Sequence, residues 1–270
     1  GLALADEKDM ARLVTLIFQT AQTLAKADGG VLYLLEGEEL GVELLSLHAE
    51  SLVLGGLSGN PAPRVKVRPA IMPFLSPASV LRPACEAMQT RLPVSARDTD
   101  LTMFPTGLPE EPTGCRIASH LTIPLMTRRN EMLGVLQLFN PELPGPDAAD
   151  GTAMDRFIAS LAAQAAVALD NHNLVNSLRQ LFDALIQVIA SSIDAKSPYT
   201  AGHCTRVPVL TEMLARAVHE TGDGPLRDFR IETDDDWRQL WIASWLHDCG
   251  KVTTPEYVVD KATKLETIYN

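Results

Sequence analysis

The sequence IPLMTRRNEMLGVLQLFNPE, residues 123–142, contains two apolar segments of strand length separated by a basic turn. We expect one strand over Ser119–Leu125 and a second over Met132–Phe139, joined by the turn MTRRNE. Gly134 lies inside the second strand, where a glycine indicates either a bulge or the close approach of another backbone. The stretch therefore predicts a β-hairpin within an antiparallel sheet.

A second hairpin is predicted nearer the N-terminus, where Val31–Leu35 and Val42–Leu47 are apolar runs separated by the polar loop EGEELG. Before them, Asp9–Ala27 carries apolar residues at spacings of three and four, which predicts an amphipathic helix. Two hairpins and this helix indicate an α+β domain in which a four-stranded antiparallel sheet is flanked by helices.

The segment from Pro61 to Pro112, between the hairpins, holds ten of the eighteen prolines. Because prolines break helices and remove donors from strand ladders, we expect mostly loop there, with one helical interval near Ser79–Thr90. A long loop over a sheet face is either a lid on a ligand pocket or plain packing. The residues do not decide between the two.

A long connecting helix is predicted after the second hairpin. Residues 152–197 contain neither proline nor glycine, enough for a helix of roughly 65 Å. Within it, apolar residues step by four, three, four and three, as in the seam of a coiled coil: Leu174, Leu178, Leu181, Leu185 and Val188. Either this seam packs on the chain's own domains, or it forms a parallel homodimer whose helix carries conformational change towards the C-terminus.

The composition limits partners and location. The formal net charge is −11, and the lysines and arginines form no run that would follow a phosphate backbone, which argues against a nucleic-acid partner. The four scattered cysteines fit reduced thiols. No stretch approaches the roughly 18 apolar residues of a membrane span, and the N-terminus lacks the layout of a signal peptide. We therefore expect a cytoplasmic protein with no membrane partner.

The order of helix, hairpin, loop-rich middle, hairpin and closing helix resembles a GAF domain over residues 6–172, most clearly in residues 123–142 and the following FIASLAAQAAVALDN. The resemblance implies a sensor domain with a small-molecule ligand, whose identity is unknown. Asn140 is followed by Pro141, which departs from the Asn-Lys signature of cyclic-nucleotide-binding members. Cys115 as a bilin attachment site and His120 as a haem ligand are alternatives to the interpretation of both as structural residues.

Metal chemistry is indicated by two motifs, SPYTAGHCTRV at residues 197–207 and LHDCGKVTTPEYVVDKATKLE at residues 246–266. A divalent ion that activates water needs His nitrogens and carboxylate oxygens that converge from different elements. His203, together with the adjacent His247 and Asp248, meets that need, and Asp248 is placed to bridge towards a second metal. We predict these three residues as metal ligands.

Two basic residues follow the predicted ligands at helical spacing. Lys251 lies three residues after Asp248, and Arg206 lies three residues after His203. An ammonium or guanidinium on the ligand face can contact a phosphate oxygen, so both are candidates for substrate binding. The acidic run at residues 234–236 is expected to cap a helix, with a metal cluster as the less favoured alternative.

The two motifs are similar to those of the HD-GYP family of cyclic di-GMP phosphodiesterases, whose blocks read PYTxGHxxRV and HDIGKIGIPDxILxKPGKL. The similarity covers residues 183–270 and implies an all-α HD-type domain, two divalent metals of the Fe or Mn type, cyclic di-GMP as substrate, and catalytic roles for Asp248 and Lys251. Tyr199 stands where some members carry a Glu ligand, which favours two metals over three. The family's further His ligands and its GYP block have no counterpart here, so we expect a truncated domain.

These observations predict a GAF-regulated, metal-dependent phosphodiesterase whose activity belongs to a longer parent protein, the present chain alone being inactive. The alternative from another class is a non-enzymatic dimeric sensor, with a degenerate HD region that binds a partner. The sequence downstream of residue 270 would distinguish them, because the enzyme needs the second His pair and the GYP block.

Overall fold

The computed structural model describes residues 10–48, 51–104, 116–142, 151–194, 202–255 and 258. The chain divides into two compact units, residues 1–175 and 176–270. The predicted helices and hairpins are present in the first unit, and helix α4, Gly151–Asp194, runs from the first unit into the second.

The first unit is built on an antiparallel sheet of seven strands in the order β3-β2-β1-β7-β6-β5, with β4 paired to β2. The strands are β1 Gly29–Glu36, β2 Glu39–Leu47, β3 Leu52–Gly55, β4 Lys66–Val67, β5 Val94–Leu101, β6 Ile117–Met126 and β7 Met132–Phe139. Both predicted hairpins are confirmed, as β1–β2 and β6–β7. A Cβ on Gly134 would lie 2.2 Å from the Tyr33 carbonyl oxygen, so this glycine allows the close approach of β1.

The prediction of four strands was wrong, because three more pair at the sides of the sheet. β3 and β4 have four and two residues, too short to show a period in the sequence. β5 reads VSARDTDL, and its mostly exposed or half-buried residues include three charged ones. Tertiary pairing with β6 makes it a strand, which its composition does not predict. The described part of the proline-rich segment, residues 61–104, also contains the 3₁₀ helix η2, Pro69–Phe74, and helix α3, Leu81–Thr90.

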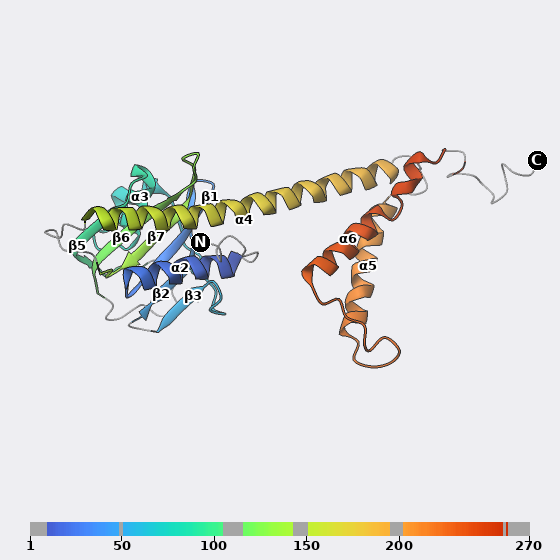
Figure 1. Cartoon of the computed structure of the whole chain (residues 1–270), viewed down its shortest axis with the longest axis horizontal. Coiled ribbons are helices and arrows are strands. Elements are labelled where there is room, and N and C mark those ends of the chain that lie inside the picture. The colour runs from blue at the N-terminus through green and yellow to red at the C-terminus, as the bar shows by residue number, and fades with distance from the viewer. Residues whose placement is uncertain are drawn as a thin grey trace, which may run out of the picture. The chain divides into compact units, whose positions relative to one another are not determined.

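Helices cover both faces of the sheet. Helix α2, Met10–Ala25, and the first part of α4 lie side by side over one face, as Figure 1 shows. Their apolar residues form one buried cluster with that face of the sheet, including Phe18 and Leu169. The opposite face forms a second cluster with α3, which includes Tyr33 and Cys85. Because both faces are covered, the central strands are apolar nearly throughout.

The described part of the second unit contains helices and 3₁₀ turns: the end of α4, α5 His203–Glu220, α6 Asp234–Leu246 and the 3₁₀ turn η3 Cys249–Thr253. Thr233 is the N-cap of α6 and forms a capping box with Asp236. The acidic run thus occupies the first turn of this helix, and Asp236 is the member of it that contributes to the cap. Along α6, Ser244 is buried while the three tryptophans are only half-buried. Among the helices that the structure describes, none has the length and apolar character needed to cross a membrane.

Candidate metal centre

His203 stands at the first position of α5. The chain reaches it through Gly202, whose φ of 73° is left-handed and therefore favours glycine. The Gly202 carbonyl accepts hydrogen bonds from the Arg206 backbone N–H (3.2 Å) and from the Thr205 hydroxyl (3.0 Å), which closes the first turn. The ring of His203 thus extends from a well-formed helix start rather than from a loop.

His247 and Asp248 lie just beyond the other helix. α6 ends at Leu246, and the chain tightens into η3, so His247 is the C-cap rather than part of a continuous ligand helix. His247 Nδ1 lies 2.7 Å from the Ser244 carbonyl oxygen. Because a carbonyl can only accept, Nδ1 donates the proton, and in the neutral ring Nε2 presents a lone pair. This backbone contact orients the ring as a metal ligand requires.

The three predicted ligands converge. His203 Nε2 lies 3.1 Å from His247 Nε2, and Asp248 Oδ2 lies 3.6 Å and 3.4 Å from these two atoms respectively. Donor atoms bound to one ion at about 2.1 Å are about 3.0 Å apart at a right angle and about 3.4 Å apart at the tetrahedral angle. The observed separations lie in or close to that range. The side chains therefore fit a single divalent ion, and two imidazoles with one carboxylate suit Fe, Mn or Zn.

Asp248 carries the charge of the cluster. Lys251 Nζ donates to Asp248 Oδ2 at 2.7 Å, and the carboxylate side chain is only 13% exposed. Burial by itself raises the pKa of this carboxyl, but the hydrogen bond from Lys251 and the nearby charges of His247, Lys251 and His203 outweigh it, so the pKa lies below its ordinary value. The group is thus held ionised, as a metal ligand must be.

The structure brings Lys251 to the cluster, although not in the way predicted. Asp248 is the N-cap of the 3₁₀ turn η3 and Lys251 lies within this turn, so the two do not share one face of an α-helix. In a 3₁₀ turn, side chains three residues apart are eclipsed, which brings the two side chains together. Arg206 lies on the first turn of α5 and is exposed to solvent. Its role in substrate binding stays a prediction.

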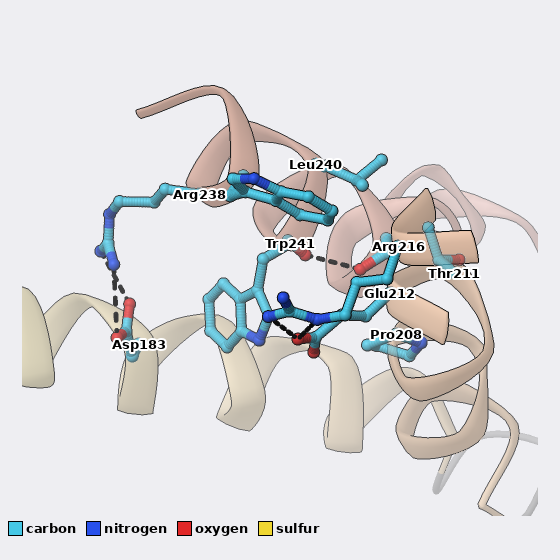
Figure 2. Close-up of a pocket in the computed structure, with 10 residues that line it drawn as sticks. Asp183, Pro208, Thr211, Glu212, Arg216, Arg238, Leu240 and Trp241 are labelled. Carbon is cyan, nitrogen blue, oxygen red and sulfur yellow. Dashed lines mark hydrogen bonds and ion pairs between the residues drawn. The ribbon is translucent and has the colours of Figure 1, made fainter. Parts of the chain in front are cut away.

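Charged side chains from α4, α5 and α6 line a cavity of about 300 Å³, shown in Figure 2. Arg238 of α6 pairs with Asp183 of α4 at 2.7 Å. On α5, Arg216 pairs with Glu212 at 2.7 Å and lies over the Trp237 ring, 4.9 Å from its centroid. These contacts fix α5 and α6 against each other and against the end of α4.

Sequence reasoning missed two supporting features of the centre. The Ser244 carbonyl that orients His247 is a backbone atom, so residue type gives no signal for it. The pair Asp183–Arg238 joins residues 55 positions apart, and neither belongs to a motif. Only the docking of α6 on α4 brings them together.

His120 and Cys115 are the two alternative cofactor-binding residues of the sensor domain, and the structure describes the first of them. His120 lies on β6 and is 4% exposed, with Nδ1 3.3 Å from the Thr122 hydroxyl. Burial lowers its pKa, so the ring is held neutral within the sheet. Cys115 lies outside the described residues. On the same sheet face, the Tyr33 hydroxyl donates to Gln137 Oε1 (3.1 Å), and Gln137 Nε2 donates to the Val80 carbonyl (2.9 Å), so these buried polar groups have partners.

Comparisons with known proteins agree with the first unit and extend to phosphodiesterases. A family model described as GAF domain matches residues 7–170. The chain is 35% identical over 92 residues to 3'3'-cGAMP-specific phosphodiesterase 3 of Vibrio cholerae serotype O1, a match that covers 32% of this chain and 17% of that protein. It is 33% identical over 97 residues to 3'3'-cGAMP-specific phosphodiesterase 2 of the same organism, covering 36% of this chain and 16% of that protein.

Among solved structures, the GAF domain of an Acinetobacter phosphoenolpyruvate-protein phosphotransferase aligns at 18% identity with a TM-score of 0.42, covering 65% of this chain and 91% of that one. The chain spans about a sixth of the length of the two curated phosphodiesterases that it matches.

Proposed function

This chain belongs to the GAF-domain family, and on that premise we propose that it is the regulatory and N-terminal catalytic part of a signalling phosphodiesterase of the HD-GYP type. In this proposal the sensor domain binds a small molecule. The second unit contributes His203, His247 and Asp248 to a metal centre that hydrolyses a cyclic dinucleotide.

The observation that carries the proposal is the convergence of three ligand atoms from two motifs that are 44 residues apart. His203 Nε2, His247 Nε2 and Asp248 Oδ2 lie 3.1–3.6 Å from one another, and the Ser244 carbonyl orients one of the rings. Two unrelated surface histidines have no reason to direct their Nε2 atoms at the same point beside a half-buried carboxylate. A divalent ion bound there supplies the chemistry of activating water as a nucleophile.

The remaining side chains of the centre have binding roles in this proposal. Lys251 holds Asp248 ionised and oriented, and its ammonium lies where a substrate phosphate approaches. Arg206, exposed one turn into α5, adds a second positive charge on the side of His203. The full ligand set for two ions exceeds these three side chains, so hydrolysis is assigned to the longer parent protein and not to residues 1–270.

Two cyclic dinucleotides are candidate substrates. The sequence motifs favour cyclic di-GMP, whereas the curated relatives are named for 3'3'-cGAMP. The two substrates share the cyclic sugar–phosphate ring and differ in one base. Residues 1–270 contain no group that we assign to base recognition, so the choice depends on direct comparison of both substrates.

The test compares the longer parent protein with residues 1–270, each loaded with Mn²⁺ or Fe²⁺ and given either dinucleotide. We expect metal-dependent hydrolysis by the parent, its loss in His247→Ala, and weak metal binding without turnover in the shorter chain. His219→Ala is the matched control, because this histidine accepts a backbone hydrogen bond from Ile231 at the far end of α5. A parent that binds no metal, or that shows the same activity after His247→Ala, would overturn the proposal. Turnover by residues 1–270 that His247→Ala abolishes would show instead that the centre is completed within these residues or across a dimer.

The second part of the proposal is a homodimer formed through α4. The five seam residues are each 53–68% exposed, whereas Ile186, Ala190 and Ile193, on the opposite side of the helix towards its end, are buried. The seam is therefore not covered by the described residues of its own chain, which favours the parallel dimer over self-packing. Such a pair of helices can transmit a change in the sensor to the metal centre, because α4 contacts α6 through the pair Asp183–Arg238.

A further inference from the structure

The part of α4 that covers the sensor sheet has two different sides. One side is buried against the sheet, through Ala165, Ala168 and Leu169. The other side is exposed and mixes apolar and amide groups: Val167 is 39% exposed, Leu174 is 60% exposed, and Asn171 between them is exposed as well. Val167 and Leu174 lie one helical turn on either side of Asn171, and the three residues form an exposed stripe along the helix. A side that faced only solvent would be expected to carry polar residues instead of this valine and leucine.

This stripe continues the coiled-coil seam in register. Counting back from Leu174 by three gives Asn171, and a further four gives Val167, so the alternation of four and three is preserved. Asn171 thus occupies the same heptad position as Leu178 and Leu185, the a position, while Val167 and Leu174 occupy d positions. The seam therefore begins on the sensor domain itself, two positions before the leucine run that the sequence pattern shows.

A groove runs beside this extension. The turn between β6 and β7, Thr127–Glu131, faces α4 across a cavity of about 380 Å³ that Val167, Asn171 and Leu174 also line. The turn is well ordered, because the Thr127 hydroxyl accepts from the backbone N–H groups of Arg129 and Glu131 at 3.2 and 3.1 Å. An apolar stripe that contains one amide and is flanked by charged side chains is typical of a surface that binds another helix.

We propose that the occupant of this stripe is α4 of a second copy of the chain, running parallel and in register, with Asn171 paired to the same residue of that copy. The inference rests on the homodimer of the proposed function. An amide both donates and accepts, so two Asn171 side chains at the same level satisfy each other. In an antiparallel pair each amide would face an apolar d residue, and in a parallel pair shifted by one heptad it would face an apolar a residue such as Leu178, so in both cases it would lose its partner. Asn171 is thus the residue that specifies orientation and register.

A second copy fits the stripe better than a foreign peptide because the surface is self-complementary. The same seven-residue spacing extends over Val167, Asn171, Leu174 and the four seam residues that follow, through to Val188. A partner needs an identical repeat, with its polar residue at the identical level, to match every position. The chain supplies that partner itself.

The first experiment is cysteine cross-linking of residues 1–270. Asn171→Cys, oxidised at low protein concentration, should give a covalent dimer several-fold faster than the unsubstituted chain, whose native thiols, the exposed Cys249 among them, set the background. Asn173→Cys is the matched control, since Asn173 is exposed but lies at a c position away from the seam. If the chain is dimeric but Asn171→Cys cross-links no faster than Asn173→Cys, this inference is overturned and the dimer stands. A chain that is monomeric by light scattering would overturn the dimer and this inference together.

The second experiment replaces the amide by an apolar group. Asn171→Leu should tighten association by about tenfold or more through the extra buried side chain, and it should spread the population beyond parallel dimers. Sedimentation velocity measures both effects, and Asn173→Leu should change neither. If Asn171→Leu remains a dimer of unchanged affinity, the residue is solvated and has no role in register.

Discussion

The proposed homodimer leads to a quantitative prediction for the seam of α4. Leu178 and Leu181 are 54% and 68% exposed in the single chain, and burying a whole leucine side chain contributes about 1.5–3 kcal/mol. Because about half to two-thirds of each side chain remains to be covered, each should contribute about 1–2 kcal/mol to association. A dimer contains four such side chains, so replacing both by lysine removes about 4–8 kcal/mol. At about 1.4 kcal/mol per factor of ten, the dissociation constant should rise about 10³-fold or more.

The assay is light scattering on a sizing column with residues 1–270, whose monomer mass is 29.3 kDa. We expect the unsubstituted chain to run at twice that mass and Leu178→Lys/Leu181→Lys to run as the monomer. The matched control is Gln180→Lys/Gln187→Lys, which adds the same charge to the same helix at exposed positions off the seam. The reasoning fails if the unsubstituted chain is monomeric, if the seam variant keeps the dimer mass, or if the control dissociates as readily.

Three further predictions concern contacts within one chain. Asp183 and Arg238 can be replaced by alanine singly and together in a double-mutant cycle of urea unfolding. We expect a coupling free energy of about 1 kcal/mol, because the pair is bidentate but about one-third exposed. Additive effects of the two substitutions would mean that this pair does not join α4 to α6. His120 is buried with a lowered pKa, so below about pH 6.5 the unfolded chain binds more protons than the folded chain. The free energy of unfolding of the sensor domain should therefore fall from pH 7.5 to 5.5, and it should fall less in His120→Gln. An equal fall in the variant and the unsubstituted chain would contradict this prediction. Burial raises the pKa of Cys85 to about 11 while Cys249 is exposed, so peptide mapping after brief maleimide treatment should find Cys249 labelled and Cys85 unlabelled until urea is added.

Local patterns determined the elements whose signals are contained in a few neighbouring residues. Alternating and continuous apolar runs gave the β1–β2 and β6–β7 hairpins, spacings of three and four gave α2, and the absence of proline and glycine gave α4. The candidate ligands could also be predicted, because His203, His247 and Asp248 are identified by residue type within two compact motifs. In each case the physical cause, a period or a donor type, is present in the sequence itself.

Tertiary structure alone decided the rest. β3, β4 and β5 are too short or too polar to form by propensity, and they are strands because a neighbouring edge offers hydrogen bonds. The candidate metal centre depends on α5 and α6 docking so that side-chain atoms of residues 44 positions apart come within 3.1 Å. It also depends on a backbone carbonyl at Ser244 that no residue type indicates. The seam of α4 shows the same spacing of apolar residues in the sequence whether these residues are buried or exposed in the structure. Only packing shows which face the rest of the chain covers, because burial is a property of the neighbours in space and not of the residues that carry the pattern.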